Sequence, residues 1–134
     1  MRLFRTRTMA MVILIGSMLF CAGVQAHNTK QTTHHVQHVV ICWLKHPGNT
    51  EERERLIAAS HQLAALPGVI SVEAGQAIVG DRPMVDSSFD VGVVFTFSDE
   101  AALRAYERNP VHIQAVQETL LPLVEKILVY DFSE

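Results

Sequence analysis

The stretch VQHVVICWL, residues 36–44, constrains the fold of this chain more than any other segment. Its β-branched and apolar residues occupy both parities, so the segment predicts a strand whose two faces are both covered. One face would carry Val36, Val40, Cys42 and Leu44, and the other Val39, Ile41 and Trp43. Helices on one side of a single sheet cover only one of these faces. The second face therefore needs another partner.

The remaining patterns predict the element order βαββα(α)β. Asn49, with Glu52 three residues later, marks a helix start, and Pro67-Gly68 marks its end. Further elements are expected as strands over 69–79 and 89–97 around a loop at 80–88, and as helices over 98–106 and from Asn109-Pro110 to about 125. Pro122 can kink or shorten the second of these helices, and a last strand is expected over 126–132. This order predicts an α+β, ferredoxin-like fold with a four-stranded antiparallel sheet. A second copy of the same sheet is the simplest cover for the apolar outer face, so we expect a homodimer.

Residues 1–26 have the pattern of a secretory signal peptide. Arg2, Arg5 and Arg7 precede an apolar run over 9–24, and the small residues around Ala26 suit cleavage after it. We therefore expect a periplasmic or secreted protein with no stable membrane anchor after cleavage, with a retained anchor as the alternative. The polar, histidine-containing stretch 27–35 is expected to be a flexible arm, followed by one domain over 36–134.

Charge and cysteine content exclude several classes of function. The whole chain has 11 basic and 14 acidic residues, and the expected cleavage leaves eight basic residues against 14 acidic ones. Such an acidic chain is a poor binder of nucleic acid phosphates, so no nucleic acid partner is expected. Cys42 is then the one remaining thiol, which excludes an intrachain disulfide. We expect Cys42 to be buried and unreactive.

Several segments together resemble the stress-responsive A/B barrel (Dabb) domain family. They are His38 to Lys45, the corner Leu66-Pro67-Gly68-Val69, Phe95-Thr96-Phe97, Tyr106, Asn109-Pro110-Val111-His112 and Val129-Tyr130-Asp131-Phe132. The resemblance covers nearly all of residues 36–133 and implies a dimeric α/β barrel of two ferredoxin-like chains. It implies little about activity, because many members of the family have no assigned reaction.

One member of that family, olivetolic acid cyclase, resembles this chain at its working positions. The resemblance assigns His38, Tyr106 and His112 as candidate catalytic residues, while Asn109 and Ala59 stand where the cyclase has a histidine and a tyrosine. A neutral imidazole near a helix N-terminus, as at His112, suits a general base, and a nearby phenol can polarise a carbonyl. Each of the three is equally compatible with a packing or capping role.

We therefore expect an apolar pocket that holds a small hydrophobic or aromatic molecule, with acid/base chemistry of a cyclase or lyase type on a carbonyl compound. Its expected lining residues are Val40, Cys42, Leu56, Ala59, Val93, Val124, Ile127 and Val129. A non-catalytic ligand-binding or stress-response protein is the alternative. No cofactor is expected, and the spacing of His27, His34 and His35 makes them weak candidates for binding copper or zinc.

Overall fold

The computed structural model describes residues 34–134. The expected signal peptide, its cleavage site and His27 lie outside the described residues. Within 34–134, the helices are too short or too polar to span a membrane.

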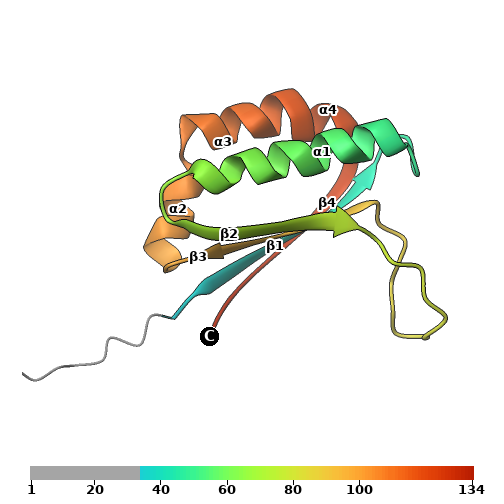
Figure 1. Ribbon diagram of the computed structural model, residues 1–134, viewed down its shortest axis with the longest axis horizontal. Helices are drawn as coiled ribbons and strands as arrows, with labels where there is room; N and C mark the ends of the chain where they lie inside the picture. Colours follow the sequence, from blue (N-terminus) through green and yellow to red (C-terminus); the bar gives the residue numbers. More distant parts are fainter. Residues whose placement is uncertain (1–33) are drawn as a thin grey trace, which may run out of the picture. The chain divides into compact units, whose positions relative to one another are not determined.

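Four antiparallel strands form one sheet in the order β2-β3-β1-β4, which confirms the ferredoxin-like α+β fold. The helices all lie on one side of this sheet (Figure 1). The elements are β1 (Val36–Leu44), α1 (Thr50–Gln62), a 3-10 turn η1 (Leu63–Ala65), β2 (Val69–Gln76), β3 (Val91–Phe97), α2 (Glu100–Glu107), α3 (Pro110–Ala115), a π-helical turn η2 (Val116–Leu120), α4 (Leu121–Leu123) and β4 (Val124–Ser133). The doubly apolar strand β1 has a neighbour on each edge.

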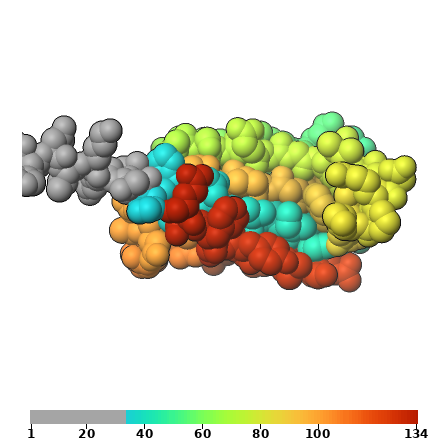
Figure 2. Space-filling view, turned by 90° about the horizontal axis from the view of Figure 1, so that it is seen from below, coloured from blue at the N-terminus to red at the C-terminus, as the bar shows by residue number. Residues whose placement is uncertain are grey.

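The two faces of the sheet differ in how they are covered. The helix-facing side holds the core, with Cys42, Leu44, Val91 and Phe97 fully buried. On the opposite side, which we call the open face, Tyr130 pairs with Val39 and Leu128 pairs with Ile41. The exposed fraction is 38% for Leu128, 55% for Tyr130 and 56% for Phe132. Figure 2 views the molecule from this side, where β4 lies along one edge of the strands.

Side-chain caps fix the starts of α1, α2 and α3, and those of α1 and α3 lie at the expected residues. Asn49 Oδ1 accepts from the Glu52 N–H at 3.1 Å, and Asp99 Oδ1 accepts from the Ala102 N–H at 2.8 Å. Asn109 Oδ1 accepts from the Val111 N–H at 2.9 Å, directly before the first helical residue, Pro110. These bonds satisfy N–H groups that a helix start leaves without partners.

Packing of α2 against the sheet requires the glycine in the Pro67-Gly68 corner. Gly68 adopts a φ of +86°, which L side chains rarely adopt. A Cβ at this position would also lie 2.7 Å from the Cβ of Ala102 in α2. The corner therefore ends the helical segment formed by α1 and η1, and the lack of a side chain at Gly68 lets α2 approach closely.

The prediction of a helix from Asn109 to about residue 125 is wrong at its end. Pro122 has no N–H to donate, and the preceding turn widens so that the Leu121 N–H bonds to Val116 O. Lys45 Nζ then donates to the carbonyls of Leu121 and Pro122 at 2.9 and 3.0 Å, which caps this end. Strand β4 consequently starts at Val124.

The second strand is also shorter than predicted, because it ends at Gln76 instead of residue 79. Gln76 lies opposite Val91, the first residue of β3, so the chain beyond it has no strand to pair with. Ile78 and Val79 are accordingly 85% exposed in the loop that follows.

Candidate functional site

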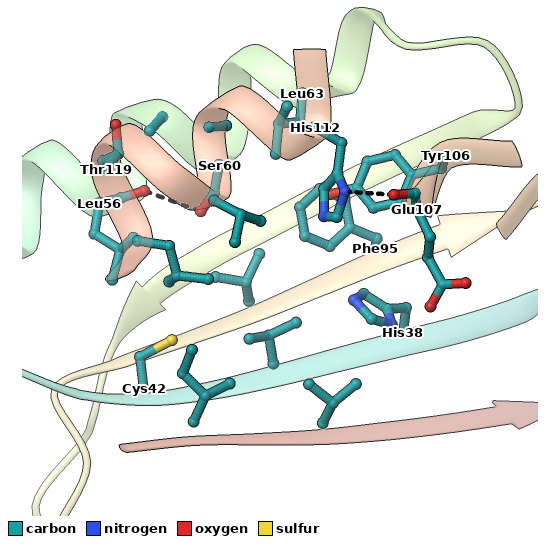
Figure 3. A pocket seen from close by; sticks show the side chains of 18 residues that line it. His38, Cys42, Leu56, Ser60, Leu63, Phe95, Tyr106, Glu107, His112 and Thr119 are labelled. Atoms are coloured by element: carbon teal, nitrogen blue, oxygen red, sulfur yellow. Dashed lines mark hydrogen bonds between the residues drawn. The ribbon is translucent and has the colours of Figure 1, made fainter. Parts of the chain in front are cut away.

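A cavity of about 240 Å³ lies between the sheet and the helices α1 and α3 with the turn η2 (Figure 3). The helices contribute side chains at helical spacing, as with Leu56, Ala59, Ser60 and Leu63. The complete lining is His38, Val40, Cys42, Leu56, Ala59, Ser60, Leu63, Val93, Phe95, Tyr106, Glu107, His112, Ala115, Val116, Thr119, Leu120, Ile127 and Val129. Every expected lining residue is present except Val124. That residue is buried in the core at the start of β4, because the last helix ends earlier than expected.

The three candidate catalytic residues meet at one end of this cavity. The ring centroids of Tyr106 and His112 are 4.4 Å apart, and those of His38 and Tyr106 are 6.3 Å apart. Tyr106 ends up beside His112 because the capped break at Asn109-Pro110 turns the chain from α2 into α3. Tyr106 is 2% exposed and also packs on Phe95 and on Phe97.

His38 is paired with a carboxylate that the sequence analysis missed. Its Nδ1 lies 2.6 Å from Asp131 Oδ1, and the two residues are directly opposite in the β1–β4 ladder. A carboxylate accepts hydrogen bonds, so we assign the His38 proton to Nδ1, which leaves Nε2 as an acceptor. The His38 side chain is 10% exposed and packs near Phe95.

His112 is held by the main chain at the end of α2. Its Nδ1–H donates to the carbonyl oxygen of Glu107 at 3.2 Å, which leaves Nε2 with a free lone pair. Burial lowers the pKa of His112 below its ordinary value of 6.5, and the neighbouring His38 lowers it further, while the hydrogen bond to Glu107 opposes this. His112 is therefore neutral near pH 7, as a general base must be.

Tyr106 and Cys42 are both held in their uncharged forms. Burial raises the pKa of the Tyr106 phenol well above its ordinary value of 10, and the charge of Glu107 raises it further. Tyr106 therefore remains a hydrogen-bond donor, which can stabilise negative charge on a carbonyl oxygen. Burial also raises the pKa of the Cys42 thiol to about 11, so this thiol is a poor nucleophile at neutral pH.

Asp131, Glu107, Ser60 and Thr119 complete the polar surroundings, and the sequence analysis selected none of them. Ser60 is buried and donates its hydroxyl to Leu56 O at 2.9 Å. Asp131 carried a usable signal, because it shares strand parity with Ile127 and Val129 and so places a carboxylate on an otherwise apolar face. Glu107 lies in an exposed charged stretch and carried no such signal.

The two described histidines of the arm lie away from this cavity. His34 Nδ1 contacts the carbonyl oxygen of Glu134, and His35 O accepts from the Glu134 N–H at 3.2 Å. Among residues 34–134, no three His, Cys, Asp or Glu side chains are grouped so that they could hold a metal ion.

Solved structures share this fold. A Dabb family protein with a ferredoxin-like fold from Mesorhizobium loti is 29% identical, with a TM-score of 0.62, over 74% of this chain and 95% of that protein. A dimeric ferredoxin-like protein from Jannaschia is 26% identical, with a TM-score of 0.59, over 73% of this chain and 97% of that one. A hydroxynitrile lyase from Passiflora edulis shares the fold at 20% identity and a TM-score of 0.62, over 76% of this chain and 94% of the lyase.

No curated protein sequence matches this chain significantly. The model of the Stress Responsive A/B Barrel Domain matches residues 36–134, which include every strand and helix described above. The chain therefore belongs to the stress-responsive A/B barrel (Dabb) domain family.

Proposed function

We propose that this protein is an exported homodimer that binds a small, largely apolar carbonyl compound and transfers a proton on it. The observation that carries the proposal is the apolar cavity of about 240 Å³ with His38, Tyr106 and His112 gathered at one end. An apolar pocket with a few convergent polar groups is the usual form of a small-molecule site. The pKa directions of His112 and Tyr106 suit a base and a neutral donor.

The proposed step is removal of a proton from the carbon next to the carbonyl. His112 Nε2 accepts the proton, and the electron pair of the broken C–H bond moves towards the carbonyl oxygen. The Tyr106 hydroxyl donates a hydrogen bond to that oxygen as its negative charge develops. His38, with Nδ1–H fixed on Asp131, presents Nε2 to the pocket as a second proton acceptor.

The dimer is proposed on two grounds. The open face exposes Leu128, Tyr130 and Phe132 beside the apolar residues of β1, and an apolar face of this kind is typical of an interface. The Jannaschia protein with the same fold is dimeric. Export is proposed from the pattern of residues 1–26 alone.

Native mass spectrometry of the protein from an exported fraction tests the assembly and identifies the ligand. The expected spectrum is a dimer of chains that begin at His27, with a stoichiometric small-molecule adduct. A monomer that stays monomeric at micromolar concentration would contradict the dimer.

Replacement of His112 by Ala then separates an enzyme from a binding protein. With the identified ligand as substrate, we expect His112→Ala to lower turnover by ~10²-fold or more while the pocket still binds. His61→Ala is the matched control, because His61 is exposed on α1 and lies outside the cavity. Unchanged turnover in His112→Ala would refute the role of the base, and a wild-type protein that binds without turnover would be a binding protein.

A further inference from the structure

The cavity combines an apolar body with polar groups that carry no fixed positive charge. Among the described residues that line it, none is Lys or Arg. Tyr106 and His112 are uncharged near pH 7 because burial disfavours their ionised forms. The polar end therefore offers hydrogen-bond donors and acceptors but no permanent cation for an anionic ligand.

Glu107 adds a carboxylate at the mouth of this cavity. Glu107 and Val129 are the exposed residues of its lining, so the cavity reaches the surface at the end of α2 and along strand β4. Figure 3 shows the Glu107 side chain extending from α2 towards the sheet, beside His38. Its charge is near enough to influence the pKa of both His112 and Tyr106.

A second cavity beside the first has a mixed-charge lining. It is lined by Glu100, Arg104, Glu107 and Asp131 together with Val36, Leu103, Phe132 and Ser133. Arg104, its one cation among the described residues, is paired with Glu100 at 2.9 Å. Glu107 lines both cavities, and Asp131 stands behind His38, so carboxylates outnumber cations around Glu107.

We infer that the pocket takes uncharged single-ring molecules bearing a hydroxyl or carbonyl group, and that Glu107 excludes carboxylates from it. The inference rests on the proposed function, because it concerns the ligand of the same site. The size follows from the volume: a dry cavity of about 150 Å³ holds benzene, so about 240 Å³ leaves room for one ring with short substituents. A carboxylate entering past Glu107 would meet a like charge and leave its own charge unpaired in an apolar cavity.

The test compares two probes of similar size that differ in charge, 4-methylphenol and 4-methylbenzoate, by isothermal titration of the dimer at pH 7.5. Wild-type protein is expected to bind the phenol at least about tenfold more tightly than the benzoate. Glu107→Gln is expected to lower the ratio of phenol affinity to benzoate affinity by about fivefold, mainly by improving benzoate binding. Added salt should narrow the wild-type ratio in the same direction, because Glu107 is solvent-accessible and its charge is screened.

Glu118→Gln is the matched control, because Glu118 is an exposed carboxylate on η2 that lines neither cavity. It removes the same charge from the protein and should leave the ratio unchanged. Equal affinity of the wild-type protein for both probes would overturn the inference, as would a ratio that Glu107→Gln and Glu118→Gln change alike. Binding of neither probe to folded wild-type protein would overturn the inferred ligand class, whereas the proposed function would fail if the native protein carried no ligand and showed no turnover.

Discussion

Replacement of Asp131 by Asn tests the pairing on which the orientation of His38 depends. The substitution keeps the shape of the side chain but changes the group that faces His38 Nδ1. In the wild type, the carboxylate accepts the Nδ1–H at 2.6 Å, which leaves Nε2 as the acceptor towards the cavity. An Asn amide can instead donate to Nδ1, which would move the imidazole proton to Nε2 and make that atom a donor.

The size of the effect follows from the geometry. A hydrogen bond to a charged group contributes about 1.5–3 kcal/mol to stability. Because the Asp131 side chain is 45% exposed and water screens its charge, we expect a smaller loss on substitution, about 1 kcal/mol. In a domain of this size such a loss lowers the Tm by about 4 °C. If His38 takes part in proton transfer, turnover should fall by about 10²-fold in addition.

Imidazole ¹⁵N chemical shifts distinguish a protonated Nδ1 from a protonated Nε2 and therefore report the tautomer directly. The expected result is an Nδ1–H form of His38 in the wild type and an Nε2–H form in Asp131→Asn. Asp81→Asn, in the exposed loop after β2, is the control for loss of one carboxylate. A His38 that keeps its Nδ1 proton in Asp131→Asn, with unchanged turnover, would refute this reasoning.

Two further predictions concern pH and assembly. The folded-state pKa of His112 lies below its ordinary value of 6.5, so the unfolded chain binds the additional proton first and stability falls as pH decreases below 6.5. Between pH 7.5 and 5.5, the free energy of unfolding in urea should fall less for His112→Gln than for the wild type. Equal decreases in the two proteins would contradict the burial of His112. Tyr130→Asp, which places a charge on the open face, should weaken dimerisation at least about 100-fold by sedimentation equilibrium. Val111→Asp is its control, because Val111 is similarly exposed, at 53%, but lies in α3.

Local patterns were sufficient to predict much of this fold. The doubly apolar segment 36–44 forms the internal strand β1, and Asn49 and Asn109 cap the helices that they were expected to cap. Such features depend on neighbours a few residues apart, so the sequence carries them directly. The proximity of Tyr106 and His112 could also be predicted locally, because only the Asn109-Pro110 break between two short helices separates them.

Features that depend on tertiary packing could not be predicted in this way. Pairing of His38 with Asp131 requires the register between strands 93 residues apart in sequence, and no local pattern specifies that register. The end of the last helix follows in part from Pro122, which the sequence shows, but its capping by Lys45 from the end of β1 is a tertiary contact that no local pattern specifies. Val124 was assigned to the pocket because the helix was expected to extend beyond it, whereas β4 begins at that residue.

Strand β4 connects the site with the open face, because successive residues point to opposite sides. Asp131 points to His38, whereas Tyr130 and Phe132 face outward on either side of it. A shift of β4 by one residue relative to β1 would move Asp131 to the open face and abolish its hydrogen bond to His38. Since β4 is an edge strand, its register is held by pairing with β1, by packing of Val124 and Ile127 on the core and, in the proposed dimer, by the partner on the open face. We therefore expect Tyr130→Asp, when it dissociates the dimer, also to increase hydrogen exchange of the His38 Nδ1 proton. Slow exchange of that proton in the dissociated monomer would show that contacts within one chain are sufficient to fix the site.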